Sequence, residues 1–369
     1  MARADIVVVG AGIIGAALAE ELARHGRRVT LIDRGRVGAE ASTAAAGILS
    51  AHMDVKEPGP LCDLCQAARK MYPRWVEHLE RKAGISVGYH VDGILALILS
   101  GREEHAMKRQ ARWQTRLGLR VERWSPKDIR RQEPAVDGKV RCAFHFPTEA
   151  QINVVQLMQA LAIACRKAGV EVLEQTNVSR LLLRDQAVRG VETNHGVYEA
   201  PVVVNCLGSW ASTGGAFPLT LPIEPARGQM LAFQGPPRLF RRAVMSSRAY
   251  VVQRRDGRML VGSTIERVGF DKSLTVEGMH GILCGARHFS SALNTCTFLD
   301  AWTGLRPATR DGLPILGSTS IDGLYVAAGH FRHGILLAPI TATLMAELIL
   351  RGRASFDIAP FSAHRFAEK

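Results

Sequence analysis

A glycine-rich turn between a short apolar run and a helical pattern constrains this chain more than any other feature. Residues 4–9 (ADIVVV) form the β-branched run expected of a buried parallel strand, and they lead directly into Gly10-Ala11-Gly12-Ile13-Ile14-Gly15. A helical pattern of apolar residues follows up to Gly26, and a second apolar run, Val29–Ile32, ends at Asp33. The sequence therefore predicts a βαβ unit that opens a doubly wound, Rossmann-like domain.

The spacing of this motif predicts a bound dinucleotide. Gly10 permits the tight turn, Gly12 lets the backbone approach a pyrophosphate, and Gly15 allows the helix to pack closely on the strand. The helix N-terminus would offer free N–H groups and a positive dipole to the phosphates. Asp33, 18 positions after Gly15, would accept hydrogen bonds from an adenosine ribose. The small-residue segment 38–47 that follows would let the backbone lie close against a large flat ligand.

Apolar runs that suit the same domain return far along the chain. Val202–Cys206 and Leu324–Ala328 are typical of buried strands, and Gly334–Leu350 is typical of a closing helix. The fold class predicted is α/β with an α+β insert, in which a strand-rich domain interrupts the nucleotide-binding domain. We expect residues 1–50, 150–215 and 298–369 in the discontinuous nucleotide-binding domain, and residues 51–149 and 216–297 in the substrate-binding domain. Trp302–Pro314 is expected to be a polar loop.

Composition narrows the class of protein. With 47% apolar and 22% charged residues in a 369-residue chain, the sequence is globular and neither disordered nor a coiled coil. Seven scattered cysteines indicate a reducing compartment. We find no signal peptide, and Gly334–Leu350 is interrupted by Pro339 and Glu347, so a packed helix is favoured over a membrane span. The sequence predicts a soluble, cytoplasmic protein.

The net charge of +13 comes largely from residues 102–141 and 238–267. A basic surface attracts nucleic acids, anionic membranes or anionic substrates. Neither stretch carries a zinc pattern, a helix-turn-helix signature or interleaved aromatic residues, so no nucleic-acid partner is expected. Peripheral contact with a membrane stays open, and so does the formation of a homo-oligomer.

Four stretches make the sequence similar to a known family. They are VVVGAGIIGAALAEELARHGRRVTLIDRG, ASTAAAGIL, GLRPATRDGLPILG and LYVAAGHFRHGILLAP, and they lie near both ends of the chain. With them the chain resembles the FAD-dependent D-amino-acid oxidase superfamily and, within it, the glycine oxidases of thiamine biosynthesis. The resemblance implies that the dinucleotide is FAD. No cysteine lies near residues 304–317, where some relatives attach the flavin covalently, so non-covalent FAD is expected, with no metal.

The resemblance also assigns residues to the cofactor. The glycine turn would hold the pyrophosphate, Asp33 and Arg34 the adenosine, and Val178 the adenine, while residues 330–336 would wrap the isoalloxazine. The dipole of the helix that begins at Gly334 would stabilise negative charge on a reduced flavin. The complete set expected at FAD is Gly10, Gly12, Ile13, Ile14, Gly15, Asp33, Arg34, Ala41, Ser42, Ala46, Gly47, Ile48, Val178, Gly208, His330, Phe331, Arg332, His333, Gly334, Ile335 and Leu336.

Three residues are expected at the substrate. Arg306 matches the arginine that holds the substrate carboxylate in this family, and its planar guanidinium suits a two-pronged grip on such a group. Tyr250 matches a tyrosine that lines the substrate site, and Arg332 lies near the substrate end of the flavin. Ile265 stands where glycine oxidases often have methionine, so the limit on the substrate side chain stays open.

The function that the resemblance implies is oxidative deamination of glycine, sarcosine or a D-amino acid. A hydride would pass from Cα to flavin N5, and the imine would yield an oxo acid and ammonia or enter thiazole assembly. Such chemistry needs orientation and an unprotonated amine, with no dedicated protein base. Oxygen is the expected electron acceptor, with formation of hydrogen peroxide. Two alternatives stay open: a dehydrogenase that passes electrons to a quinone, and a flavin oxidoreductase that modifies tRNA.

Overall fold

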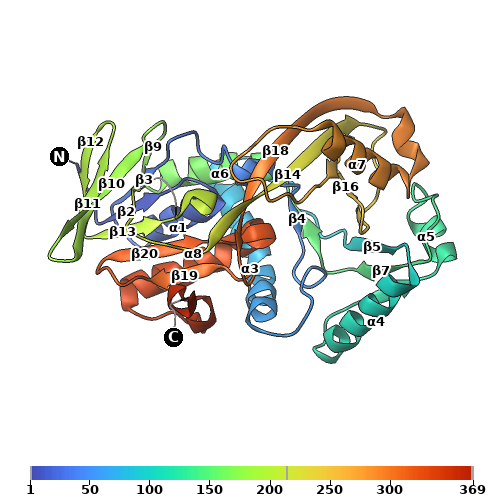
Figure 1. Ribbon diagram of the computed structural model, residues 1–369, viewed down its shortest axis with the longest axis horizontal. Coiled ribbons are helices and arrows are strands. Elements are labelled where there is room, and N and C mark those ends of the chain that lie inside the picture. The colour runs from blue at the N-terminus through green and yellow to red at the C-terminus, as the bar shows by residue number, and fades with distance from the viewer. Residues whose placement is uncertain (1, 213–214, 367–369) are drawn as a thin grey trace.

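The strands predicted around the glycine turn lie at the centre of a six-stranded sheet (Figure 1) in the computed structural model, which describes residues 2–212 and 215–366. The sheet has the order β19-β20-β13-β2-β3-β9, and all neighbours are parallel except β19 and β20. The strands are β2 (Ile6–Val9), β3 (Val29–Ile32), β9 (Glu171–Leu173), β13 (Val202–Asn205), β19 (Ile315–Ser318) and β20 (Leu324–Ala328). The predicted α/β fold is confirmed.

This sheet is buried on both faces, as parallel sheets are. Alternate residues of β2 divide between two cores: Ile6 and Val8 pack toward the helices, whereas Val7 and Val9 pack toward a second sheet of order β1-β12-β11-β10. That sheet consists of β1 (Ala2–Arg3), β10 (Val178–Arg184), β11 (Ala187–Thr193) and β12 (Gly196–Glu199). The helical layer contains α1 (Ile13–Arg24), α3 (Pro60–Ala83), α6 (Val154–Lys167) and α8 (Gly334–Arg351).

A larger sheet forms the other half of the molecule (Figure 1), with the strand order β18-β14-β17-β16-β15-β5-β7-β6. Its strands are β5 (Ile94–Ile98), β6 (Glu122–Trp124), β7 (Cys142–Phe146), β14 (Ile223–Gln234), β15 (Ala243–Met245), β16 (Tyr250–Gln253), β17 (Arg258–Gly262) and β18 (Thr297–Thr309). Helices α5 (Pro126–Gln132) and α7 (Val276–Arg287) contribute apolar side chains to the core on one face of this sheet. The core on the other face includes Ala46 and Met53, so this face lies against the nucleotide-binding half. The remaining elements are α2 (Ala41–Ala44), α4 (Gly101–Arg116), β4 (Ile48–Leu49) and β8 (Ala150–Gln151).

The expectation of a polar loop at Trp302–Pro314 is wrong for its first part. Residues up to Thr309 belong to β18, which pairs along its length with β14. The strand lies at the edge of the sheet, where proline is tolerated because its missing N–H can face away from the neighbouring strand. The predicted domain boundary at residue 298 assigns β18 to the nucleotide-binding domain. In the structure this strand pairs with β14 and belongs to the larger sheet. The division of the chain into two domains stays a proposal.

Helix α8 closes the nucleotide-binding half. The segment Phe331–Arg351 is long and apolar enough to cross a membrane, and 67% of its most apolar window is buried inside the protein. Its buried side chains share one core with α1 and α3, which supplies the apolar surroundings that its composition requires. Pro339 lies in the second turn of the helix and is itself buried.

Candidate functional site

A cavity of about 690 Å³ opens between the two halves of the molecule. Its walls come from the glycine turn, the loop 40–48, the residues after β13, the loop 245–250, the middle of β18 and the turn before α8. The cavity holds two groups of charged side chains. Asp33, Arg34 and Glu40 form one, and Asp54, Arg306 and Arg332 contribute to the other.

The glycine turn has the geometry of a phosphate cradle. Gly10 has φ of +105°, and a Cβ there would lie 2.5 Å from the carbonyl oxygen of Cys206. A Cβ on Gly15 would lie 1.9 Å from the oxygen of Gly10, so the close approach of α1 to the turn requires glycine. Gly12, the residue before α1, provides no side-chain cap, and the Ile13 N–H donates to the Ser42 hydroxyl at 2.9 Å. A ligand phosphate can therefore interact with the first turn of α1.

Asp33 supports the same turn. Its carboxylate accepts hydrogen bonds from the N–H groups of Ala11 at 2.7 Å and Gly35 at 2.8 Å. Burial raises the pKa of Asp33 despite these two hydrogen bonds. The neighbouring Arg34 guanidinium lies 4.2 Å from the centroid of the Trp210 ring, which also lines the cavity. This end of the site therefore offers an acceptor for hydroxyl groups and a flat cationic and aromatic surface.

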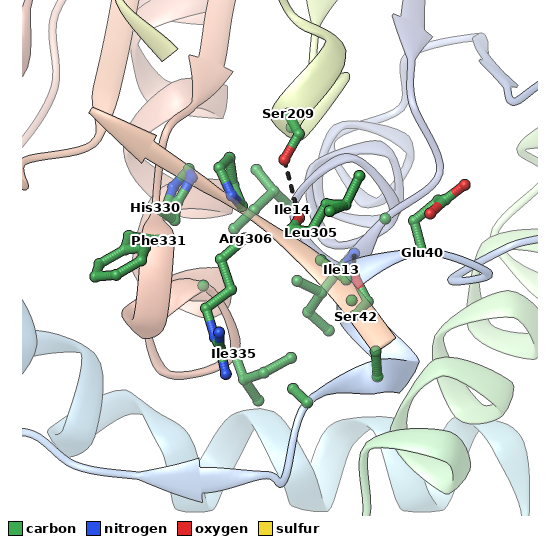
Figure 2. A pocket seen from close by; sticks show the side chains of 18 of the residues that line it. Ile13, Ile14, Glu40, Ser42, Ser209, Leu305, Arg306, His330, Phe331 and Ile335 are labelled. Carbon is green, nitrogen blue, oxygen red and sulfur yellow. Dashed lines mark hydrogen bonds between the residues drawn. The ribbon is translucent and has the colours of Figure 1, made fainter. Parts of the chain in front are cut away.

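Arg306 extends from β18 into the cavity (Figure 2) without a carboxylate partner among the described residues. Its Nη1 donates to the carbonyl oxygen of Thr264 at 3.1 Å, and its Nη2 donates to the Ser263 hydroxyl at 2.7 Å. Burial lowers the pKa of Arg306, and a guanidinium remains a cation in proteins. A desolvated cation that faces a cavity and has only neutral partners is suited to bind an anionic ligand.

Two more predicted residues lie in the same part of the cavity. The Tyr250 hydroxyl donates to the Met230 sulfur at 3.1 Å. Tyr250 and Arg332 both lie close enough to change the pKa of Arg306, which Tyr250 raises and Arg332 lowers. Arg332 lies 3.9 Å from the Asp54 carboxylate with 42% of its side chain exposed, so this ion pair is loose. The structure thus brings Arg306, Tyr250 and Arg332 together in one chamber.

The turn before α8 supplies the remaining wall. Phe331 has φ of +46°, and the three residues Phe331–His333 form a short 3-10 helix before α8 begins at Gly334. His330 is buried, and its Nε2 lies 3.1 Å from the Thr341 hydroxyl oxygen. Burial lowers the pKa of His330 to about 3, so its imidazole is neutral at physiological pH. The N-terminus of α8 therefore meets the cavity beside an uncharged histidine.

The buried His330 leads to a pH dependence of stability. Its pKa of about 3 in the folded protein lies below the value of about 6.5 expected after unfolding. The unfolded chain therefore takes up a proton first, and the stabilising effect is lost as the pH falls from about 6.5 toward 3. Between pH 7 and pH 5 this group should lower the free energy of unfolding by about 2 kcal/mol.

We expect His330→Gln to reduce this pH-dependent loss by about 2 kcal/mol. Urea unfolding at saturating FAD and at pH 7 and pH 5 measures it. The exposed His364, replaced by glutamine in the same way, is the control. An equal loss of stability in wild type and His330→Gln would show that folding does not lower the pKa of His330.

Nearly all residues expected at the cofactor and substrate line the cavity. The exceptions are Gly15, His333 and Leu336, which lie behind its wall. Gly15 packs against the Gly10 backbone, His333 is buried with its Nδ1 4.0 Å from the Cys65 sulfur, and Leu336 lies in the core. The roles assigned to the individual residues stay proposals.

Sequence reasoning missed several residues of the site. Ser263 and Thr264, which hold Arg306, directly follow β17 and carry no catalytic motif. Asp54 and Trp210 carry no local motif, although both line the cavity. Only the packing of segments far apart in the chain brings these residues to the site, and a single sequence does not display that packing.

Gly228 on β14 lies opposite Gly304 on β18 and leaves room for the Arg306 guanidinium. A Cβ on Gly228 would lie 2.2 Å from Nη1 of Arg306. We therefore expect Gly228→Ala to displace the guanidinium and raise the KM for a carboxylate substrate roughly 10-fold, as for a weakened charged hydrogen bond. Steady-state kinetics measure the effect, with Gly281→Ala as control because that position faces open space. An unchanged KM would show that Arg306 does not hold the substrate in the position described.

Comparison with known proteins places this geometry in a family. The family described as "DAO: FAD dependent oxidoreductase" matches residues 5–348. A glycine oxidase from Geobacillus kaustophilus is 33% identical over 371 residues, covering 100% of this chain and 98% of that protein. The crystal structure of glycine oxidase from that organism has a TM-score of 0.96 at 32% identity, with 100% of both chains covered.

A bifunctional ThiO/ThiG protein from Synechocystis is 36% identical over 98% of this chain but only 54% of its own length. The chain thus spans about half the length of the bifunctional relatives it matches. The glycine cradle, the first turn of α1 without a side-chain cap at Gly12 and the α8 N-terminus at the cavity wall fit FAD. Because the family matches nearly the whole length of this chain, the chain belongs to the DAO family of FAD-dependent oxidoreductases and uses FAD as its cofactor.

Proposed function

We propose that this protein catalyses the FAD-dependent oxidative deamination of glycine or another small amino acid such as sarcosine or a D-amino acid. The observation that carries the proposal is Arg306, a partly buried cation that faces the cavity and is held by Ser263 and Thr264 with no carboxylate partner among the described residues. The glycine oxidase from Geobacillus kaustophilus, which shares the whole fold, supports the choice of substrate class.

Each residue of the chamber has a distinct task in this reaction. Arg306 would bind the substrate carboxylate through two parallel hydrogen bonds, which orients Cα in the cavity. Tyr250 would line the same chamber and hydrogen-bond to the carboxylate. The positive charges of Arg306 and Arg332 favour the neutral amine over the ammonium form, which the reaction requires. When bound, FAD supplies the acceptor for the hydride that leaves Cα.

The proposed products follow from the balance of atoms and electrons. Glycine loses two electrons and two protons to give an imine, and water converts the imine to glyoxylate and ammonia. Oxygen, the proposed acceptor, takes up the two electrons and two protons as hydrogen peroxide. The imine could alternatively be used for thiazole formation in thiamine biosynthesis, a role supported by the ThiO/ThiG relatives. A cytoplasmic location, self-association and contact with anionic membranes belong to this proposal as well.

Anaerobic mixing of the purified flavoprotein with glycine, sarcosine, D-alanine and D-proline tests the proposal. The expected result is rapid bleaching of the flavin band near ~450 nm by at least one of these amines. Readmitted air should restore the band and produce peroxide in proportion. Bleaching without recovery in air would point to another acceptor such as a quinone. No bleaching by any of them would overturn the substrate assignment while leaving the FAD site in place.

A further inference from the structure

Arg254 is a buried arginine whose role the site described so far does not explain. Its exposed fraction is 8%, and it follows β16 in the hairpin that leads to β17. The other deeply buried arginine, Arg227, forms ion pairs with Glu266 and Asp271, whereas Arg254 forms none in the described part of the chain. Burial lowers the pKa of Arg254 to about 10, so it remains a cation at physiological pH.

The guanidinium joins the two halves of the molecule at the cavity wall. Its Nη2 donates to the carbonyl oxygen of Ala46 at 2.7 Å, and its Nη1 donates to the Gln151 side-chain oxygen at 3.0 Å. Ala46 lines the cavity, but Arg254 does not. The arginine therefore holds the cavity wall from behind, across a separation of 208 residues in the chain.

The hydrogen bond to Ala46 determines which way a peptide group faces. In a trans peptide the N–H points away from the carbonyl oxygen. Since the Ala46 oxygen is turned toward Arg254, outside the cavity, the Gly47 N–H is turned in the opposite direction, toward the cavity that Gly47 lines. Among the described residues this N–H donates to no backbone group.

The next residue keeps this arrangement in place. Gly47 has φ of +72°, and its carbonyl oxygen accepts a hydrogen bond from the Ile152 N–H at 2.8 Å. A Cβ on Gly47 would lie 2.0 Å from the Ile152 oxygen and 3.0 Å from Nη2 of Arg254. Arg254 thus holds the Ala46–Gly47 peptide, and Ile152 holds the Gly47–Ile48 peptide that follows it.

We propose that Arg254 is a positioning residue that holds the Ala46–Gly47 peptide so that the Gly47 N–H is presented to the flavin in the cavity. The buried positive charge behind that peptide adds to the stabilisation of negative charge on the flavin ring. This role rests on the FAD site and does not depend on which amine is the substrate. Its failure and the failure of the proposed function can therefore be distinguished.

Sulfite provides a test that needs no amine substrate. It adds to oxidised flavin and leaves negative charge on the ring, so its dissociation constant reports how well the protein stabilises that charge. We expect Arg254→Met to weaken sulfite binding by roughly 10-fold or more, as for the loss of a hydrogen bond from a charged donor. The visible absorption band of the bound flavin should also shift, and the midpoint potential should fall.

Two further variants separate positioning from general destabilisation. Arg255→Met changes the next residue of the hairpin, which is exposed and whose Nη2 lies 3.1 Å from His90 Nδ1. This variant should keep wild-type sulfite binding. Arg254→Lys keeps the charge, but a single ammonium group cannot donate to both Ala46 and Gln151 as the two guanidinium nitrogens do. We expect an intermediate sulfite affinity for this variant.

The outcomes decide the proposal. Weaker sulfite binding and a shifted spectrum in Arg254→Met, with partial recovery in Arg254→Lys, support it. Wild-type sulfite affinity and spectrum in an FAD-bound Arg254→Met protein overturn it, whatever the melting temperature. If Arg254→Met does not fold, the lysine variant carries the test, and wild-type values in that variant overturn the proposal.

Discussion

Arg306→Ala should raise the KM for every carboxylate substrate by about 100-fold or more while FAD remains bound. The side chain is desolvated, and Thr264 and Ser263 hold its two terminal nitrogens at 3.1 and 2.7 Å. A carboxylate bound there would lose a buried, charge-assisted pair, which costs about 2–5 kcal/mol when one partner is removed. Such a loss corresponds to roughly 30- to 5,000-fold in binding. Steady-state kinetics with glycine, together with titration by an unreactive carboxylate such as acetate, measure it.

Two variants make this result specific. Arg306→Lys keeps the charge but loses the planar fork, so its KM should lie between those of wild type and Arg306→Ala. Arg310→Ala removes an exposed guanidinium just after β18 and should leave the KM unchanged. The flavin absorption band should be retained in all three proteins. If Arg306→Ala had the KM of wild type, the carboxylate would have to bind elsewhere in the cavity.

Gly10→Ala should abolish stable FAD binding. The residue has φ of +105°, which an L-residue rarely adopts, and the added Cβ would lie 2.5 Å from the Cys206 oxygen and 2.7 Å from its carbonyl carbon. Both atoms belong to the backbone, so neither can rotate away as a flexible side chain would. The turn between β2 and α1 must open, and the amides of α1 then no longer face the phosphates. We expect the dissociation constant of FAD to rise by about 100-fold or more, equivalent to about 3 kcal/mol.

Gly26→Ala provides the matched control. This glycine also has positive φ, +78°, but a Cβ there would meet nothing within 4 Å. It therefore carries the backbone strain without the collision, and FAD binding should be close to that of wild type. Titration of the apoprotein with FAD, followed by quenching of flavin fluorescence, gives both constants. Similar losses in the two variants would mean that positive φ, and not the collision at the turn, governs the effect.

Local patterns predicted the strands and the helix around the cofactor well. β2, α1, β3, β13, β20 and α8 all lie where periodicity places them, because each is buried on the faces that its apolar residues define. The prediction for Trp302–Pro314 failed for the opposite reason. β18 lies at a sheet edge and presents Gly304, Arg306 and Pro307 to the cavity, and these residues break the apolar alternation that marks a half-buried strand.

The residues of the candidate site also differ in how far local sequence predicts them. The glycine turn and Asp33 are recognisable from sequence because adjacent residues form the cradle, and the chemistry of a phosphate-binding turn is local. The resemblance to the flavin-dependent oxidases placed Arg306, Tyr250 and Arg332, which carry no pattern of their own.

The surroundings of these residues come from strand pairing over long separations. Thr264 is 42 residues from Arg306, and Ala46 is 208 residues from Arg254. Sequence alone thus determined the type of fold and the dinucleotide cradle, since both depend on short-range periodicity and on the conformational freedom of glycine. Only the tertiary structure decided which neutral groups hold the Arg306 guanidinium and which buried cation holds the Ala46–Gly47 peptide. Burial and hydrogen-bond partners at those positions depend on contacts that no local stretch encodes.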